Sequence, residues 1–174
     1  AQQDSFPQDT DKKNEITLTP LVLIVSGWAD ISYEYLINNK SSFGVDVQFN
    51  DNKKIFDSDG DSVPNRDYRN FSVTPNYRVY FSNKYARGFF VEGFGMLHRY
   101  RGYFYTGVPY SDDYVQTKKL TNFSIGISLG NKWVTKKGFV AEIFGGLGRN
   151  LFNFDDKDPS NLALRGGISF GKRF

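Results

Sequence analysis

The sequence predicts an all-β fold, an eight-stranded antiparallel up-and-down transmembrane β-barrel, and three observations support this prediction. Apolar and polar residues alternate with a period of two in about eight separate stretches, as in strands with two different faces. Aromatic residues make up 17% of the 174 residues, and no run approaches the roughly 18 apolar residues of a membrane helix. Short turns alternate with longer polar loops, as in barrels of bacterial outer membranes.

The pattern divides the chain into a tail and a barrel. Residues 1–13 are polar and aperiodic, and we expect them to form a flexible periplasmic tail before the barrel of residues 14–174. The expected strands are, in order, residues 15–24, 29–37, 43–50, 69–81, 88–104, 120–134, 139–152 and 161–174.

The first four strands follow from local signals. The first strand leads into a tight connection at Ser26-Gly27, and the second carries Ile31 and two tyrosines at alternate positions. The third strand shows the clearest alternation, beginning at Phe43. A long polar loop precedes the fourth strand, in which Pro75 indicates a bulge or bend because proline cannot donate a ladder hydrogen bond.

The last four strands end at the C-terminal phenylalanine. The fifth begins at Gly88 and leads into a loop with Pro109, while the sixth alternates from Phe123 with serine and glycine between the apolar residues. The hairpin turn 135–138 precedes the seventh strand, and the eighth ends at Phe174. With the N-terminus in the periplasm, the short turns are periplasmic and the acidic loops extracellular.

Aromatic residues gather near the strand ends and predict two girdles at the membrane interfaces. The outer girdle would contain Tyr100, Tyr103 and Phe104, and the inner one Tyr85, Phe89, Trp133, Phe139 and Phe174. A soluble eight-stranded barrel with an apolar, ligand-binding interior is the rival interpretation. Several polar faces consist of small uncharged residues, which suits a crowded lumen better than a solvated surface. We therefore favour the membrane barrel.

Charged residues on the polar parity would be enclosed by the barrel, whose interior is just wide enough for side chains. Enclosed charges must pair, because burying an unpaired charge is costly. Acids and bases occur in similar number, which predicts a salt-bridged interior rather than a narrow conducting pore. The predicted lumen charges are Glu34, Asp46, Arg78, Glu92, Lys132, Glu142, Arg165 and Arg173.

The loop that follows the third strand is rich in aspartate. Its alternate carboxylates and Gly60 could supply hard oxygen ligands around a sharp turn, and it resembles one copy of the calcium repeats of thrombospondin type 3. Gly60 stands at the fourth position, unlike in an EF-hand loop. A solvated acidic loop and a calcium site both fit, and calcium is the one cofactor that the sequence suggests. The calcium ligands would be Asp57, Asp59, Asp61 and Asp67.

The chain has no cysteine and a single histidine, His98. Some small outer-membrane barrels modify lipids with a Ser and His pair, and Ser111 and Asp112 lie across the same hairpin as His98. No motif such as His-x-Ser is present, so we predict no enzymatic activity. A lipid-modifying enzyme centred on His98 and a narrow solute channel stay as alternatives.

Several segments carry a family resemblance. The segments 15–18, 31–35 and 43–47 look like the opening strands of small outer-membrane β-barrel families of Gram-negative bacteria, many of them known only as domains of unknown function. The segment 167–174, which ends in Phe174, resembles the C-terminal signal that the barrel-assembly machinery recognises. The resemblance implies fold and location, and these families share no catalytic residues.

The expected function is therefore structural. We expect an accessory role as a subunit of, or partner to, a larger outer-membrane complex. The expected contacts are outer-membrane lipids and lipopolysaccharide, with the barrel-assembly machinery during insertion. The net charge is +3, and the basic residues fall in short turns rather than in a stripe, so no nucleic-acid partner is expected.

Overall fold

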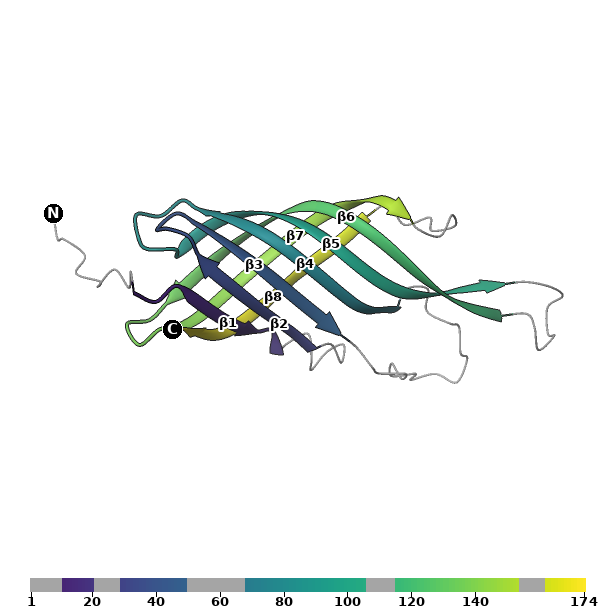
Figure 1. The fold of residues 1–174 in the computed structure, drawn as a ribbon, viewed down its shortest axis with the longest axis horizontal. Helices are drawn as coiled ribbons and strands as arrows, with labels where there is room; N and C mark the ends of the chain where they lie inside the picture. Colours follow the sequence, from purple (N-terminus) through teal and green to yellow (C-terminus); the bar gives the residue numbers. More distant parts are fainter. Residues whose placement is uncertain (1–10, 21–28, 50–67, 106–114, 154–161) are drawn as a thin grey trace.

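The computed structural model describes residues 11–20, 29–49, 68–105, 115–153 and 162–174 (Figure 1). The eight strands are β1 (Asn14–Leu18), β2 (Ala29–Leu36), β3 (Ser41–Phe49), β4 (Tyr68–Tyr80), β5 (Gly88–Tyr105), β6 (Val115–Val134), β7 (Phe139–Asn153) and β8 (Leu162–Arg173). A search of the described residues for a helix of membrane-spanning length and hydropathy found none.

The strands form one closed barrel. Each strand pairs with its neighbour in sequence, and β8 pairs with β1, with all pairs antiparallel. This confirms the predicted eight-stranded antiparallel up-and-down barrel. The start of β1, the end of β8 and the turns β2–β3, β4–β5 and β6–β7 gather at one end of the barrel, called here the short-turn end (Figure 1).

Most strand boundaries lie within two residues of the predicted ones, with two exceptions. β6 begins at Val115, whereas residue 120 was expected, and it pairs with β5 out to Tyr105. Its first residues lack a two-faced alternation, but backbone pairing does not require one. The first strand was expected to reach residue 24, and β1 ends at Leu18. The expected Ser26-Gly27 connection lies outside the described residues.

The sequence predicts a bulge or a bend at Pro75, and neither ladder of β4 shows the register shift of a bulge there. The β4–β5 ladder keeps one register from Val73 opposite Leu97 to Asn76 opposite Phe94. The register instead shifts between Arg69 and Phe71. Pro75 lies exposed on the outer face, and the β4–β5 ladder has no residue pair at Thr74 and Pro75, where proline lacks the N–H that a ladder hydrogen bond needs.

The polarity of the barrel is inverted relative to a soluble protein. Outward positions carry large apolar side chains that are 39–65% exposed, whereas most inward positions carry buried polar or charged groups. All eight strands contribute to the apolar exterior, for example Leu18, Ile31, Phe49, Val79, Leu97, Ile127, Leu147 and Leu164. The period-two alternation of the sequence thus separates an apolar outer surface from a polar interior.

An apolar cluster fills the interior at the short-turn end. It consists of Leu36, Tyr80, Tyr85, Ala86, Phe90 and Phe144. Tyr85 is only 6% exposed, so its predicted place in the inner aromatic girdle is wrong. The other members of that girdle, Phe89, Trp133, Phe139 and Phe174, are 49–57% exposed. The side chains predicted for the outer girdle lie outside the described part of the chain.

The β4–β5 turn explains why Tyr85 points inward. The Ala86 N–H donates to the Asn39 carbonyl at 2.8 Å, and the guanidinium of Arg173 donates to the carbonyls of Tyr85 and Ala86 at 3.2 and 2.7 Å. Ala86 has a φ of 40°, a left-handed conformation that is unfavourable for a residue with a side chain. These hydrogen bonds hold the strained turn across the end of the barrel, where it closes the interior.

Candidate functional site: the interior ion-pair network

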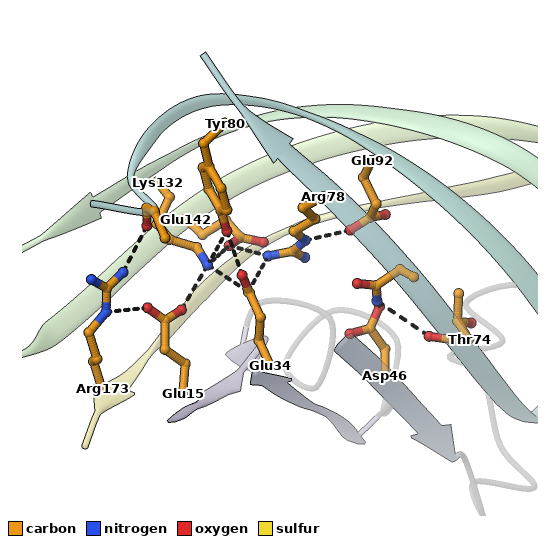
Figure 2. Close-up of polar contacts among 12 residues, drawn as sticks. Glu15, Glu34, Asp46, Thr74, Arg78, Tyr80, Glu92, Lys132, Glu142 and Arg173 are labelled. Carbon is orange, nitrogen blue, oxygen red and sulfur yellow. Dashed lines mark hydrogen bonds and ion pairs between the residues drawn. The ribbon is translucent and has the colours of Figure 1, made fainter. Parts of the chain in front are cut away.

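Charged side chains from all eight strands meet inside the barrel (Figure 2). The interior ion-pair network comprises Glu15, Glu34, Asp46, Arg78, Glu92, Lys132, Glu142, Arg165 and Arg173. Each lies on the inward parity of its strand. The strand register then brings opposite charges together across neighbouring strands, with Arg78 facing Glu92 and Lys132 facing Glu142.

Arg78 is one centre of the network. Its Nε donates to Glu92 at 2.7 Å, and its Nη1 donates to Glu34 and Glu142, each at 2.8 Å. The guanidinium also lies 4.7 Å from the centroid of the Phe90 ring, a cation–π distance. One side chain therefore connects three carboxylates from three other strands, as Figure 2 shows.

Lys132 is the second centre. Its ammonium donates to Glu34 at 2.6 Å, to Glu15 at 2.7 Å and to the Tyr80 hydroxyl at 2.7 Å. Glu15 and Glu34 face each other across β1 and β2, an arrangement that would be repulsive without a cation between them. Lys132 comes from β6, on the other side of the barrel, and supplies that cation.

Two arginines of β8 extend the network along the barrel. Arg173 donates to Glu15 at 2.5 Å and so links the network to the β4–β5 turn that it also holds. Arg165 pairs with Asp46 and lies 3.0 Å from Glu92, with its guanidinium near the rings of Phe94 and Phe144. Because β8 pairs with β1 to close the barrel, these contacts stabilise the closing strand against the interior.

The structure brings together all eight charges predicted for the lumen and adds two residues that sequence reasoning missed. Glu15 lies on the same inward parity of β1 as Thr17, and this alternation could have placed Glu15 in the interior. Tyr80 shares its parity with Arg78, but an aromatic residue at a strand end resembles a girdle residue. Tyr80 instead points inward, where its hydroxyl donates to Glu34 at 2.5 Å.

The network is enclosed within the barrel and close to neutral. Its side chains are 0–7% exposed, and it combines five carboxylates with four cations. Side chains that line a water-filled channel remain accessible to water, and these are not. The network therefore acts as a plug that holds strands distant in sequence in one arrangement, because breaking one pair would leave a buried charge without compensation.

Tyr80 offers a test of this structural role. Tyr80→Phe keeps the ring and removes the hydroxyl between Glu34 and Lys132, so we expect a loss of about 1.5–3 kcal/mol in the free energy of unfolding. Tyr77→Phe is the matched control, because Tyr77 lies on the same strand but is 47% exposed on the outer face. The measurement is urea unfolding in detergent micelles, followed by tryptophan fluorescence. Equal unfolding midpoints for the two variants would contradict the role of Tyr80.

The remaining predicted site residues lie elsewhere. His98 is buried on the inward parity of β5, between Ser72 on β4 and Asn122 on β6. Ser111 and Asp112 lie outside the described residues. Phe174 is half exposed, and its backbone exchanges two hydrogen bonds with Asn14 at the barrel seam.

The predicted calcium ligands Asp57, Asp59, Asp61 and Asp67 also lie outside the described residues. Within the part of the chain that the structure describes, no group of three or more potential ligands is placed to hold a metal ion. The calcium site stays a prediction.

Comparison with known proteins gives one match. A family model described as "Protein of unknown function (DUF3575)" matches residues 17–159, which is most of the chain and all strands from β2 to β7. No curated protein and no solved structure matches the chain.

Proposed function

The chain belongs to the DUF3575 family of proteins of unknown function, and we propose that it is a small integral β-barrel of the bacterial outer membrane with a structural role. The inverted polarity carries this proposal. Every strand contributes large exposed apolar side chains to one continuous outer surface, whereas monomeric soluble proteins rarely expose large contiguous apolar patches, and charged groups fill the interior. Hydrocarbon chains of a bilayer are the solvent that suits such an exterior.

The strand lengths and connections support the same proposal. A transmembrane strand needs roughly 9–11 residues, and six strands, β3 to β8, have 9 to 20. Three turns at the short-turn end contrast with the longer segments 50–67, 106–114 and 154–161 that follow β3, β5 and β7. Outer-membrane barrels place short turns in the periplasm, so the proposed orientation has the short-turn end and the N-terminus there.

A charge on the outer face distinguishes a membrane barrel from a soluble one. Ile127 is 60% exposed on β6, and at the bilayer midplane Ile127→Arg should cost about 2–3 kcal/mol in unfolding free energy. Phe81→Arg, at the rim of the short-turn end, is the matched control and should cost about 1 kcal/mol or less. Both variants are measured by urea unfolding in phospholipid vesicles.

A membrane barrel and a soluble barrel give different results in this experiment. In a water-exposed barrel, arginine replaces an apolar residue that was already in solvent, and both variants would unfold like the unmodified protein. That result would contradict membrane insertion.

We further propose that the barrel serves as a subunit of, or partner to, a larger outer-membrane complex. The interior is filled by the ion-pair network, so recognition has to use the outer face and the ends of the barrel. Purification of the tagged protein from native outer membranes in mild detergent, followed by mass spectrometry, tests this role. A stoichiometric larger barrel would support it, and a clean monomer would contradict it.

A further inference from the structure

Lysines surround the short-turn end of the barrel. They come from the residues before β1, from all three short turns and from the end of β8, so they are spread around the circumference. The basic collar consists of Lys13, Lys40, Lys84, Lys136, Lys137 and Lys172, all of them exposed. In the sequence these residues are scattered, and only barrel closure brings them to one rim.

Acidic residues are rare at the end of the barrel that carries the collar. Among the described residues of this end, namely 11–14, 37–40, 81–88, 135–138 and 172–174, Asp11 is the one acidic residue. The two arginines of the end, Arg87 and Arg173, are buried and donate to backbone carbonyls. The exposed charged side chains of the rim are therefore predominantly cationic.

Aromatic side chains lie beside the collar on the outer face. Phe81 and Phe89 flank the β4–β5 turn with ring centroids 5.9 Å apart, and Trp133 and Phe139 flank the β6–β7 turn. Lys172 lies on the outward parity of β8, and its ammonium is 5.8 Å from the centroid of the Phe139 ring. Exposed aromatic rings with neighbouring lysines are typical of the headgroup level of a membrane.

We propose that the basic collar binds the headgroups of anionic phospholipids in the leaflet at the short-turn end. This inference rests on the proposed insertion in a membrane and adds the lipid class that the barrel selects. A phosphodiester headgroup with net negative charge, such as phosphatidylglycerol, complements the ammonium groups, whereas a zwitterionic headgroup does not. Each lysine near an anionic surface contributes about a fivefold preference.

The arrangement favours separate small headgroups over one extended acidic polymer. The exposed collar lysines come from separate turns and strand ends around the rim, and Lys172 lies on the outward parity of β8. An acidic cell-wall polymer would contact one side of such a ring. Individual lipids can approach each lysine from the bilayer.

Nanodiscs provide the test. The full chain is inserted into nanodiscs of phosphatidylcholine with a minor fraction of phosphatidylglycerol, and native mass spectrometry counts the lipids that remain bound. The collar variant combines Lys40→Gln, Lys84→Gln, Lys136→Gln and Lys137→Gln. The matched control removes four charges from the opposite half of the barrel through Arg99→Gln, Lys118→Gln, Lys119→Gln and Arg149→Gln.

We expect the unmodified protein and the control variant to retain phosphatidylglycerol preferentially, and the collar variant to lose that preference by at least about tenfold. Added salt should weaken the preference of the unmodified protein. If the collar and control variants insert and retain phosphatidylglycerol equally, the proposed lipid binding by the collar is overturned while membrane insertion stands. Failure to insert even into pure phosphatidylcholine would instead overturn the proposed function. Collar-dependent binding to isolated peptidoglycan, without a lipid preference, would assign the lysines to the cell wall and overturn the inference.

Discussion

Arg78→Met is expected to lower the free energy of unfolding by about 3–5 kcal/mol. Arg78 donates to Glu34, Glu92 and Glu142 within 2.8 Å, and its side chain is 5% exposed. Methionine has a similar shape and keeps the contact with the apolar cluster, so the loss is mainly electrostatic. Three buried carboxylates then share the two remaining cations, Lys132 and Arg165.

The measurement is urea unfolding in detergent micelles, with heat-modifiable gel mobility as an independent check of the folded barrel. Arg78→Lys keeps the positive charge but loses the planar guanidinium that reaches several carboxylates. Its free energy of unfolding should therefore lie between those of the unmodified protein and Arg78→Met. Because Arg78→Met could fail to fold, the double variant with Glu142→Gln restores the net charge of the network. We expect it to recover at least about half of the loss. An unfolding midpoint for Arg78→Met equal to that of the unmodified protein would contradict the network as a source of stability.

The strands and the sidedness of the barrel could be predicted because both are local properties. A strand with two different environments repeats every two residues, so Val45 and Asp46 already indicate opposite faces. The register follows once the short turns are identified. The same local pattern missed the first part of β6, where the sequence of residues 115–119 does not alternate between apolar and polar residues and only pairing with β5 defines the strand.

The partners within the interior could not be predicted from the sequence. Lys132 contacts Glu15, 117 residues away, and Arg78 contacts Glu142, 64 residues away. Strand parity shows that these side chains point inward. Their positions along the barrel axis, which decide which of them meet, depend on the stagger of the strands in the closed barrel. Tyr85 illustrates the same limit, because its inward position depends on Asn39 and Arg173 from other parts of the barrel.

Closure of the barrel itself depends on a glycine at the seam. β1 and β8 share four residue pairs, and one of them joins Thr17 with Gly171. A Cβ added at Gly171 would collide with the carbonyl oxygen of Ile16 and come within 2.7 Å of the Thr17 Cα. Both atoms belong to the backbone of β1, which cannot move without breaking the ladder. A side chain at this position is therefore incompatible with the observed seam.

Gly171→Val is accordingly expected to destabilise the barrel by at least about 3 kcal/mol, near the upper limit of ordinary overpacking. Gly171→Ala should show a smaller loss in the same direction. Gly93→Ala and Gly145→Ala are matched controls on β5 and β7, because an added Cβ meets no heavy atom within 4 Å at either position. Replacing a strand glycine there should leave stability unchanged or raise it slightly, by about 0.5 kcal/mol.

The seam prediction is measured by urea unfolding in vesicles, together with the fraction of protein that shows the heat-modifiable mobility of a closed barrel. A seam that opens should also increase the protease sensitivity of β1, which has only five residues to hold it. If Gly171→Val folded as well as Gly93→Ala, the β1–β8 register would have to differ from the one described. The ion pair between Glu15 and Arg173 depends on that register, so it would have to be reassigned as well.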